Sequence, residues 1–98
     1  MAIRTLQQTI DERISFLKEQ INPQNKSEVN STLQIQIDAI RLAAEDLEEV
    51  EEIVTQKKEQ LKNSKDIQEI DMLLTELEAL EWLQAQIAVL YALEELEK

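Results

Sequence analysis

The sequence contains no glycine, no cysteine and no histidine, and it has only one proline. Because tight β-hairpin turns usually need glycine at a positive φ, a fold built from hairpins is disfavoured. Without cysteine and histidine, this chain lacks disulfides, the usual zinc ligands, a thiol nucleophile and an imidazole base. Glycine-rich phosphate loops are excluded by composition as well. The commonest forms of metal binding and catalysis are therefore missing.

Helix-forming residues make up most of the chain. Leucine, isoleucine, glutamate, glutamine, lysine and alanine dominate, and strand-favouring residues are sparse. Hydrophobic residues make up 43% of the chain, which is enough for a packed core despite 32% charged residues. A chain of 98 residues has the length of one domain. We therefore predict a single all-α domain covering residues 1–98.

Apolar residues at three- and four-residue spacing predict three helices, at about 3–21, 31–62 and 66–97. The first ends before Pro23, because proline lacks an N–H and disfavours α geometry in the residue before it. The second begins near Ser27 or Ser31, and a capping-box pattern that starts at Ser31 favours the later start. The third begins at Asp66, whose carboxylate can cap a helix. The first helix carries a narrow stripe, typical of a coiled coil, made of Ile3, Leu6, Ile10, Ile14, Leu17 and Ile21.

The short break "KNSKD" at 62–66 separates the last two helices, which are similar in length. Such a connection predicts a long antiparallel hairpin, and one continuous helix through 62–66 is the alternative. With the turn near Ser64, the start of the second helix would face residues 88–95. Lysines would then lie across from acids of the third helix, with Lys57, Lys58 and Lys62 opposite Asp66, Glu69 and Asp71.

The stretch "EWLQAQIAVLYALEEL" at 81–96 is apolar nearly all round. In a helix, one side carries Leu80, Leu83, Ile87, Leu90 and Tyr91, and the opposite side carries Trp82, Val89, Leu93 and Leu96. A helix that is apolar on two sides needs partners on both. We expect the first side to join the core and the second to contact another copy, giving a helical bundle formed by a homodimer. The predicted self-association surface consists of Trp82, Val89, Leu93, Leu96, Ile35 and Leu42.

The two aromatic residues of this stretch leave two interpretations open. Trp82 and Tyr91 fit either a core or an interface, because both combine an apolar body with a polar end. Trp82 is the better interface candidate of the two, since it lies on the side predicted to meet another copy.

The net charge of −11 is concentrated in patches: residues 45–54 carry six acids and no base, and residues 66–98 carry nine acids and one lysine. An acidic chain should repel nucleic acid and anionic membranes and can attract a basic protein surface. In the predicted hairpin two patches meet as an acidic belt made of Glu45, Glu48, Glu49, Glu52, Glu76, Glu78 and Glu81. The belt is either a solvated face or a docking site for a basic partner.

We therefore predict a small acidic helical module without enzymatic activity, metal or cofactor. It would bind other proteins or organise an assembly, and would self-associate through its C-terminal helix. The alternative is an acidic inhibitor or nucleic-acid mimic whose glutamates occupy a basic groove of a partner protein.

A third hypothesis is an enzyme. The spacings Glu45-x-x-Glu48 and Glu48-x-x-Glu51 resemble the Glu-x-x-Glu pair that binds Mg²⁺ in all-α nucleotide pyrophosphatases. That resemblance implies an Mg²⁺-dependent hydrolase. However, no Glu-x-x-Asp follows, and these acids should point away from the helical face of Leu47 and Val50 rather than into a cleft. The enzyme is therefore disfavoured.

A membrane role is also disfavoured. The apolar run 82–93 is shorter than the roughly 20 residues that span a bilayer, and glutamates flank it. The first residues do not have the basic-then-apolar pattern of a secretory signal. With the lack of cysteine, this favours a cytoplasmic location.

Overall fold

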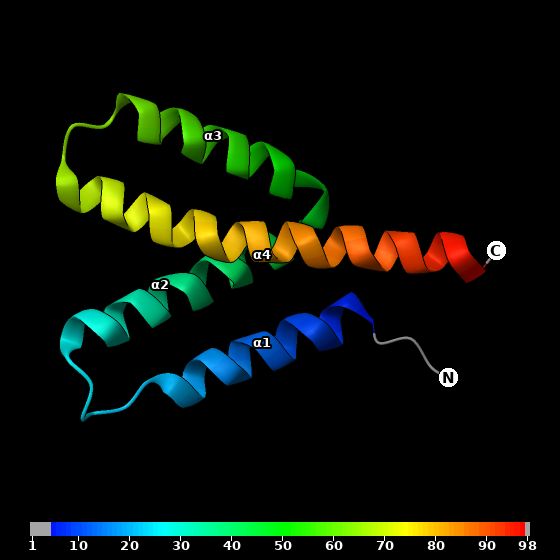
Figure 1. Ribbon diagram of the computed structural model, residues 1–98, viewed down its shortest axis with the longest axis horizontal. Coiled ribbons are helices and arrows are strands. Elements are labelled where there is room, and N and C mark those ends of the chain that lie inside the picture. The colour runs from blue at the N-terminus through cyan, green and yellow to red at the C-terminus, as the bar shows by residue number, and fades with distance from the viewer. Residues whose placement is uncertain (1–4, 98) are drawn as a thin grey trace.

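A computed structural model describes residues 5–97 of the chain, with side chains described for residues 5–96. Within this part the chain is entirely helical, with no strand, as Figure 1 shows. The elements are α1 (Leu6–Gln20), α2 (Ser27–Ala44), the short 3-10 helix η1 (Leu47–Glu49), α3 (Val50–Asn63) and α4 (Ile67–Glu97). The all-α prediction is confirmed, but the described chain forms four α-helices where three were predicted.

The first helix is defined by its cap and by the proline that follows it. The Gln8 amide N–H donates to Thr5 Oγ1 at 3.2 Å, and the Thr5 amide N–H donates to Gln8 Oε1 at 3.0 Å. This capping box starts α1 at Leu6 rather than near residue 3. Ile3, which was predicted to belong to the stripe, lies outside the described residues. The helix ends at Gln20, in agreement with the stop predicted from Pro23.

Asparagine side chains hold the connection between α1 and α2. Asn25 Nδ2 donates to the carbonyl of Gln20 at 2.8 Å, and Asn30 Nδ2 donates to the carbonyl of Asn22 at 2.9 Å. The second helix begins at Ser27, the earlier of the two predicted starts, so the capping box predicted at Ser31 is wrong. Ser31 lies inside α2, where the hydroxyl of the neighbouring Thr32 donates a hydrogen bond to the backbone carbonyl of Glu28, one turn earlier.

The largest departure from the prediction is a corner at residues 45–46, where the expected second helix divides into α2 and α3. Asp46 takes an extended conformation with φ −146° and ψ 91°, and its carboxylate accepts a hydrogen bond from the Glu48 amide at 3.2 Å. Acids at 48, 49, 51 and 52 follow in the first turns of η1 and α3. Negative side chains there favour a helix start, because they complement the partial positive charge of the helix N-terminus.

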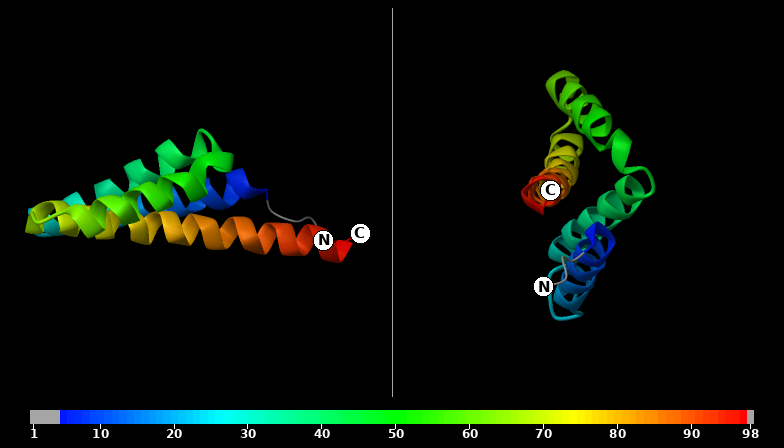
Figure 2. Two further views of the ribbon diagram at one scale, coloured as in Figure 1. Left: turned by 90° about the horizontal axis from the view of Figure 1, so that it is seen from above. Right: turned by 90° about the vertical axis from the view of Figure 1, so that its right-hand side faces the viewer.

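The corner reverses the chain, so α3 and α4 alone form the antiparallel hairpin. Figure 2 shows α3 on one side and the α1–α2 pair on the other, with α4 in the opening between them. α4 contacts mainly α2 and α3, while α1 packs chiefly against α2. The start of α2 lies beside the start of α4, since Ser31 and Ile35 line the same surface depression as Asp71 and Thr75. The predicted pairing of this segment with residues 88–95 is therefore wrong.

The core lies between α4 and the other three helices. Its most buried large side chains are Ile10, Ile37, Ile40, Val50, Leu80 and Leu83. The Cα envelope measures 48 × 35 × 18 Å. A thickness of 18 Å leaves room for two layers of helices at the usual separation of about 8–10 Å. One side of α4 is therefore covered by the other helices, and the opposite side forms the surface of the molecule.

The described part of the chain contains no helix with both the length and the apolar character needed to cross a membrane.

Candidate functional site

The side of α4 that points away from the core, called its outer face below, carries large apolar side chains. Val89 is 52% exposed, Leu93 38% and Leu96 82%. At about 100° per residue these positions lie opposite Leu80 and Leu83, which are buried. The division of α4 into an inner and an outer apolar side, which was predicted from the sequence, agrees with this burial.

The last turns of α4 extend beyond the rest of the molecule. In Figure 1 the red end of α4 continues past the start of α1 and past the corner between α2 and α3. Tyr91 belongs to the side predicted to join the core, but its side chain is 65% exposed. Leu90 is half-buried. The inner face therefore loses its cover near the C-terminal end, because α4 is longer than the helices packed against it.

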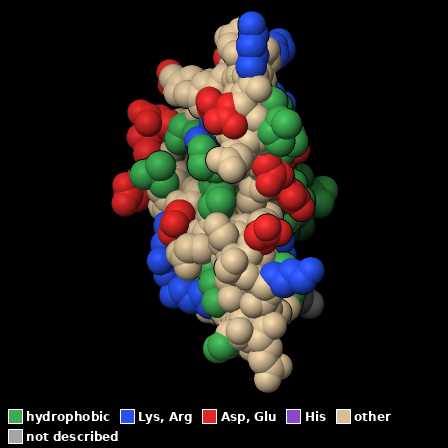
Figure 3. All heavy atoms as spheres, turned by 90° about the vertical axis from the view of Figure 1, so that its left-hand side faces the viewer, with side chains coloured by type: hydrophobic (Ala, Val, Ile, Leu, Met, Phe, Trp, Pro, Cys, Tyr) green, Lys and Arg blue, Asp and Glu red, His purple; other side chains and the backbone are tan. Residues whose placement is uncertain are grey.

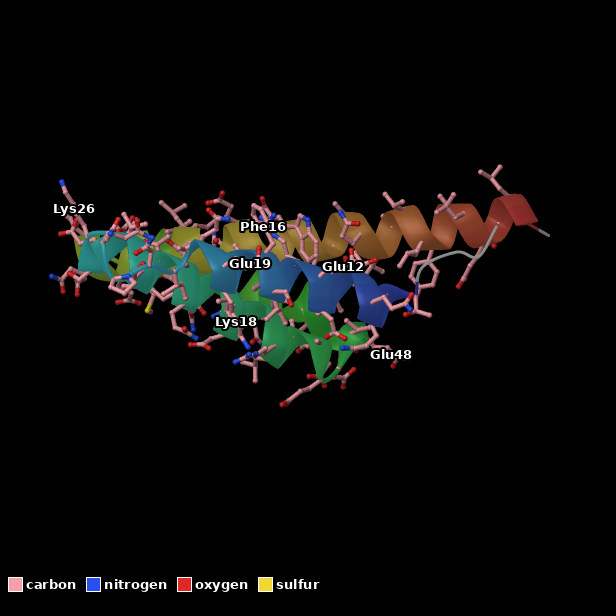
Figure 4. The ribbon with its side chains drawn as sticks, turned by 90° about the horizontal axis from the view of Figure 1, so that it is seen from below. Glu12, Phe16, Lys18, Glu19, Lys26 and Glu48 are labelled. Carbon is pink, nitrogen blue, oxygen red and sulfur yellow. The ribbon has the colours of Figure 1, made fainter. Side chains whose placement is uncertain are left out.

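Trp82 differs from the rest of the outer face because α1 covers part of it. The guanidinium carbon of Arg13 lies 5.2 Å from the Trp82 ring centre and 5.5 Å from that of Phe16. Such a cation–π contact contributes roughly 0.5–1 kcal/mol at an exposed site. Trp82 is half-buried against the edge of the core, whereas Phe16 is 50% exposed. Figure 4 shows Phe16 on the side of α1 that faces α4. Arg13 was not predicted as a partner of Trp82, and its position in the sequence gives no signal for that contact.

The structure does not bring all six predicted self-association residues together. Ile35 is half-buried beside the first turns of α4, far along that helix from Val89 and Leu96. Leu42 is exposed on α2. Figure 3 views the end of the molecule that contains the α3–α4 turn, where hydrophobic side chains are scattered among acidic ones. The residues that share one continuous surface are therefore those of α4.

Two further residues of the outer face were missed by the sequence analysis. Ala85 and Ala92 are exposed and fall between the larger residues, so that apolar positions recur at 82, 85, 89, 92 and 96. This alternation of three and four residues is the spacing of a coiled-coil contact. The signal is present in the sequence, but the larger apolar side chains dominate the pattern of this segment.

The predicted acidic belt is divided between two places. Glu45, Glu48, Glu49 and Glu52 are exposed at and after the corner between α2 and α3. Figure 4 shows Glu48 on the side of the molecule away from α4. These acids lie where the N-termini of η1 and α3 favour negative charge, so the helices themselves account for part of the cluster.

The acids of α4 have a different environment. Lys57 Nζ lies 2.7 Å from Glu76 Oε2, and both side chains are about four-fifths buried. Lys58 Nζ lies 3.8 Å from Glu81 Oε1. The predicted pairing of Lys57 and Lys58 with Asp66, Glu69 and Asp71 is therefore wrong, because the two helices meet in a different register. Glu78 is exposed. Acids paired with lysines cannot continue a row of free carboxylates, so this geometry does not favour mimicry of a phosphate backbone.

The described residues contain no group of three or more acids arranged to hold a metal ion. Glu45, Glu48 and Glu51 are all exposed. Glu45 lies in the corner after α2, Glu48 in η1 and Glu51 in α3, so they do not share one continuous helix. The Glu-x-x-Glu pairs that resemble those of the pyrophosphatases therefore do not share the single helix on which that resemblance depends.

No family model matches this sequence, and comparisons with curated proteins and with solved structures found no match.

Proposed function

We propose that this protein is a small, acidic, non-enzymatic interaction module that self-associates through the outer face of α4. The observation that supports the proposal is the exposure of Val89, Leu93 and Leu96 along one side of a helix that projects from the body. Fully burying a Val or Leu side chain contributes roughly 1.5–3 kcal/mol. Several such side chains in a row on one helix therefore favour association.

A second copy is the partner that we propose for this surface. The final turns of α4 combine exposed apolar residues with acids, so the contact between two copies would depend on the apolar stripe. A two-fold symmetric interface brings the same patch of both copies together, so it needs a surface that is complementary to itself. The repeated apolar spacing along α4 satisfies that requirement, because two such stripes can pack along their whole length. The dimer would organise an assembly by presenting two identical bodies on opposite sides of paired α4 helices.

The experiment compares the native chain with two variants that add the same charge to different sides of one helical segment. Val89→Glu places a carboxylate on the outer face, and Tyr91→Glu places one on the other side, about 160° away around the helix. Mass is measured by sedimentation equilibrium from micromolar to submillimolar concentrations. The native chain and Tyr91→Glu should approach twice the chain mass of 11.4 kDa, and Val89→Glu should remain monomeric.

Circular dichroism of each variant serves as the control for folding. A native chain that sediments as a monomer throughout this range would contradict the proposal. So would equal dissociation by both variants, since the two substitutions differ mainly in the face of α4 that they alter.

A further inference from the structure

We infer that two copies pair through α4 in an antiparallel orientation, with the two-fold axis beside residue 87. In this register Trp82 packs against the partner's Ala92, and Val89 packs against the partner's Ala85. The inference rests on the proposed self-association and adds its orientation and register. The contact surface, called the seam, consists of Trp82, Ala85, Val89, Ala92 and Leu96.

The seam alternates large and small side chains. Trp82, Val89 and Leu96 recur every seven residues, and Ala85 and Ala92 fall between them, three residues after a large one. The two alanines, Val89 and Leu96 are exposed, and Trp82 is half-buried. In a heptad repeat, 82, 89 and 96 are the first core positions and carry large side chains, and 85 and 92 are the second core positions and carry alanine.

This alternation distinguishes the two possible orientations of a helix pair. In a parallel pair like positions meet, so that tryptophan would face tryptophan and alanine would face alanine, leaving crowded layers beside empty ones. In an antiparallel pair first core positions meet second core positions, so Trp82 and Val89 each meet an alanine, and Leu96 lies beside the partner's Glu78 at the end of the seam. Close packing without voids needs such matching, because unfilled space forfeits contacts along its lining.

The arrangement also leaves room for both bodies. Leu77, Leu80 and Leu83 face the core, and Val89 lies on the other side of the same helix. The helices α2 and α3 of each copy therefore lie on the far side of their own α4 from the pair, and α1 reaches the outer face at Trp82, where Arg13 stacks on the ring. The outer face remains open toward the N-terminal end of α4, where Leu74 is 51% exposed and Glu78 is exposed as well. The partner's C-terminal turns can therefore extend along it as far as Glu78.

The test measures distances between spin labels in the intact chain, which contains no native cysteine. Asp71→Cys introduces a labelling site on the outer face beyond the end of the seam, and Glu78→Cys introduces one at its edge, beside the partner's Leu96. Double electron–electron resonance then gives the distance between the two labels of each dimer. With an axis beside residue 87, we expect about 30 Å for the label at 78 and about 50 Å for the label at 71, from the helical rise and the ~8–10 Å separation of packed helices.

The results test self-association separately from the orientation and register of the pair. An excess of about 20 Å at 71 over 78 supports the antiparallel orientation, and the absolute values support the stated register. Two equal distances below about 15 Å would indicate a parallel pair and overturn the inference while leaving self-association intact. An antiparallel pair with both distances shifted by the same amount would overturn the pairing of Trp82 with Ala92. Labelled chains that sediment as monomers, like the native chain, would overturn the proposed function itself.

Discussion

Leu83 and Leu96 belong to the same helix and have opposite degrees of burial. The side chain of Leu83 is 0% exposed, and that of Leu96 is 82% exposed. Leu83→Ala removes buried carbon atoms and leaves a cavity that the surroundings fill only in part, which costs about 2–5 kcal/mol. Leu96→Ala deletes the same atoms from a side chain that is already exposed to water, so the free energy of unfolding of the monomer should be nearly unchanged.

The expected loss at Leu83 is large for a chain of this size. A domain of 98 residues has a free energy of unfolding of roughly 5–15 kcal/mol. A loss of about 3 kcal/mol corresponds to a decrease in Tm of about 12–24 °C for a domain of this length. The two variants therefore differ by an amount that either urea or heat can resolve.

Urea unfolding followed by circular dichroism, at two protein concentrations, separates the fold from the assembly. Below the dissociation constant of the dimer, Leu83→Ala should lower the midpoint strongly, and Leu96→Ala should match the native chain. Above it, the native chain gains stability by mass action, and Leu96→Ala gains less because it weakens the seam. Equal losses for both variants at the low concentration would refute the assignment of an inner and an outer face to α4.

Two further substitutions test local features. Asp46→Ala removes the carboxylate that caps η1 and should lower the free energy of unfolding by about 0.5–2 kcal/mol in urea titrations, whereas Asp46→Asn should retain most of it; no difference between the two would count against the cap. Arg13→Gln removes the cation over the Trp82 ring and should shift tryptophan fluorescence to longer wavelength as water reaches the indole, whereas Phe16→Leu should change it less. An unchanged emission maximum in Arg13→Gln would contradict the stacking of α1 on α4.

Local signals predicted the helical class and several helix ends correctly. Pro23 stops α1, and α4 begins after Asp66, whose carboxylate accepts a hydrogen bond from the Gln68 amide at 3.0 Å. These features depend on a few neighbouring residues, so the sequence displays them directly. The break at 64–66 between α3 and α4 was recognised for the same reason.

The corner at Asp46 was missed because the apolar period passes through it without interruption. Ala44, Leu47, Val50 and Val54 keep helical spacing across the break, and no glycine or proline marks it. The available cue was an aspartate with glutamate three residues later, which is a capping pattern. That cue lies within a run of acids, where an acid at any given spacing carries little information.

The missed corner explains why some inferences about the surface failed and others did not. The direction of a side chain around α4 depends only on its position in that helix, so the separation of Val89 and Leu96 from Leu83 did not need the tertiary arrangement. The partner of a side chain depends on which helix lies opposite and in what register. The lysine pairings, and the pairing of the start of the second helix with residues 88–95, therefore inherited the wrong hairpin. The antiparallel seam depends only on positions within α4 and on a symmetry axis, so it does not require the part of the fold that the sequence concealed.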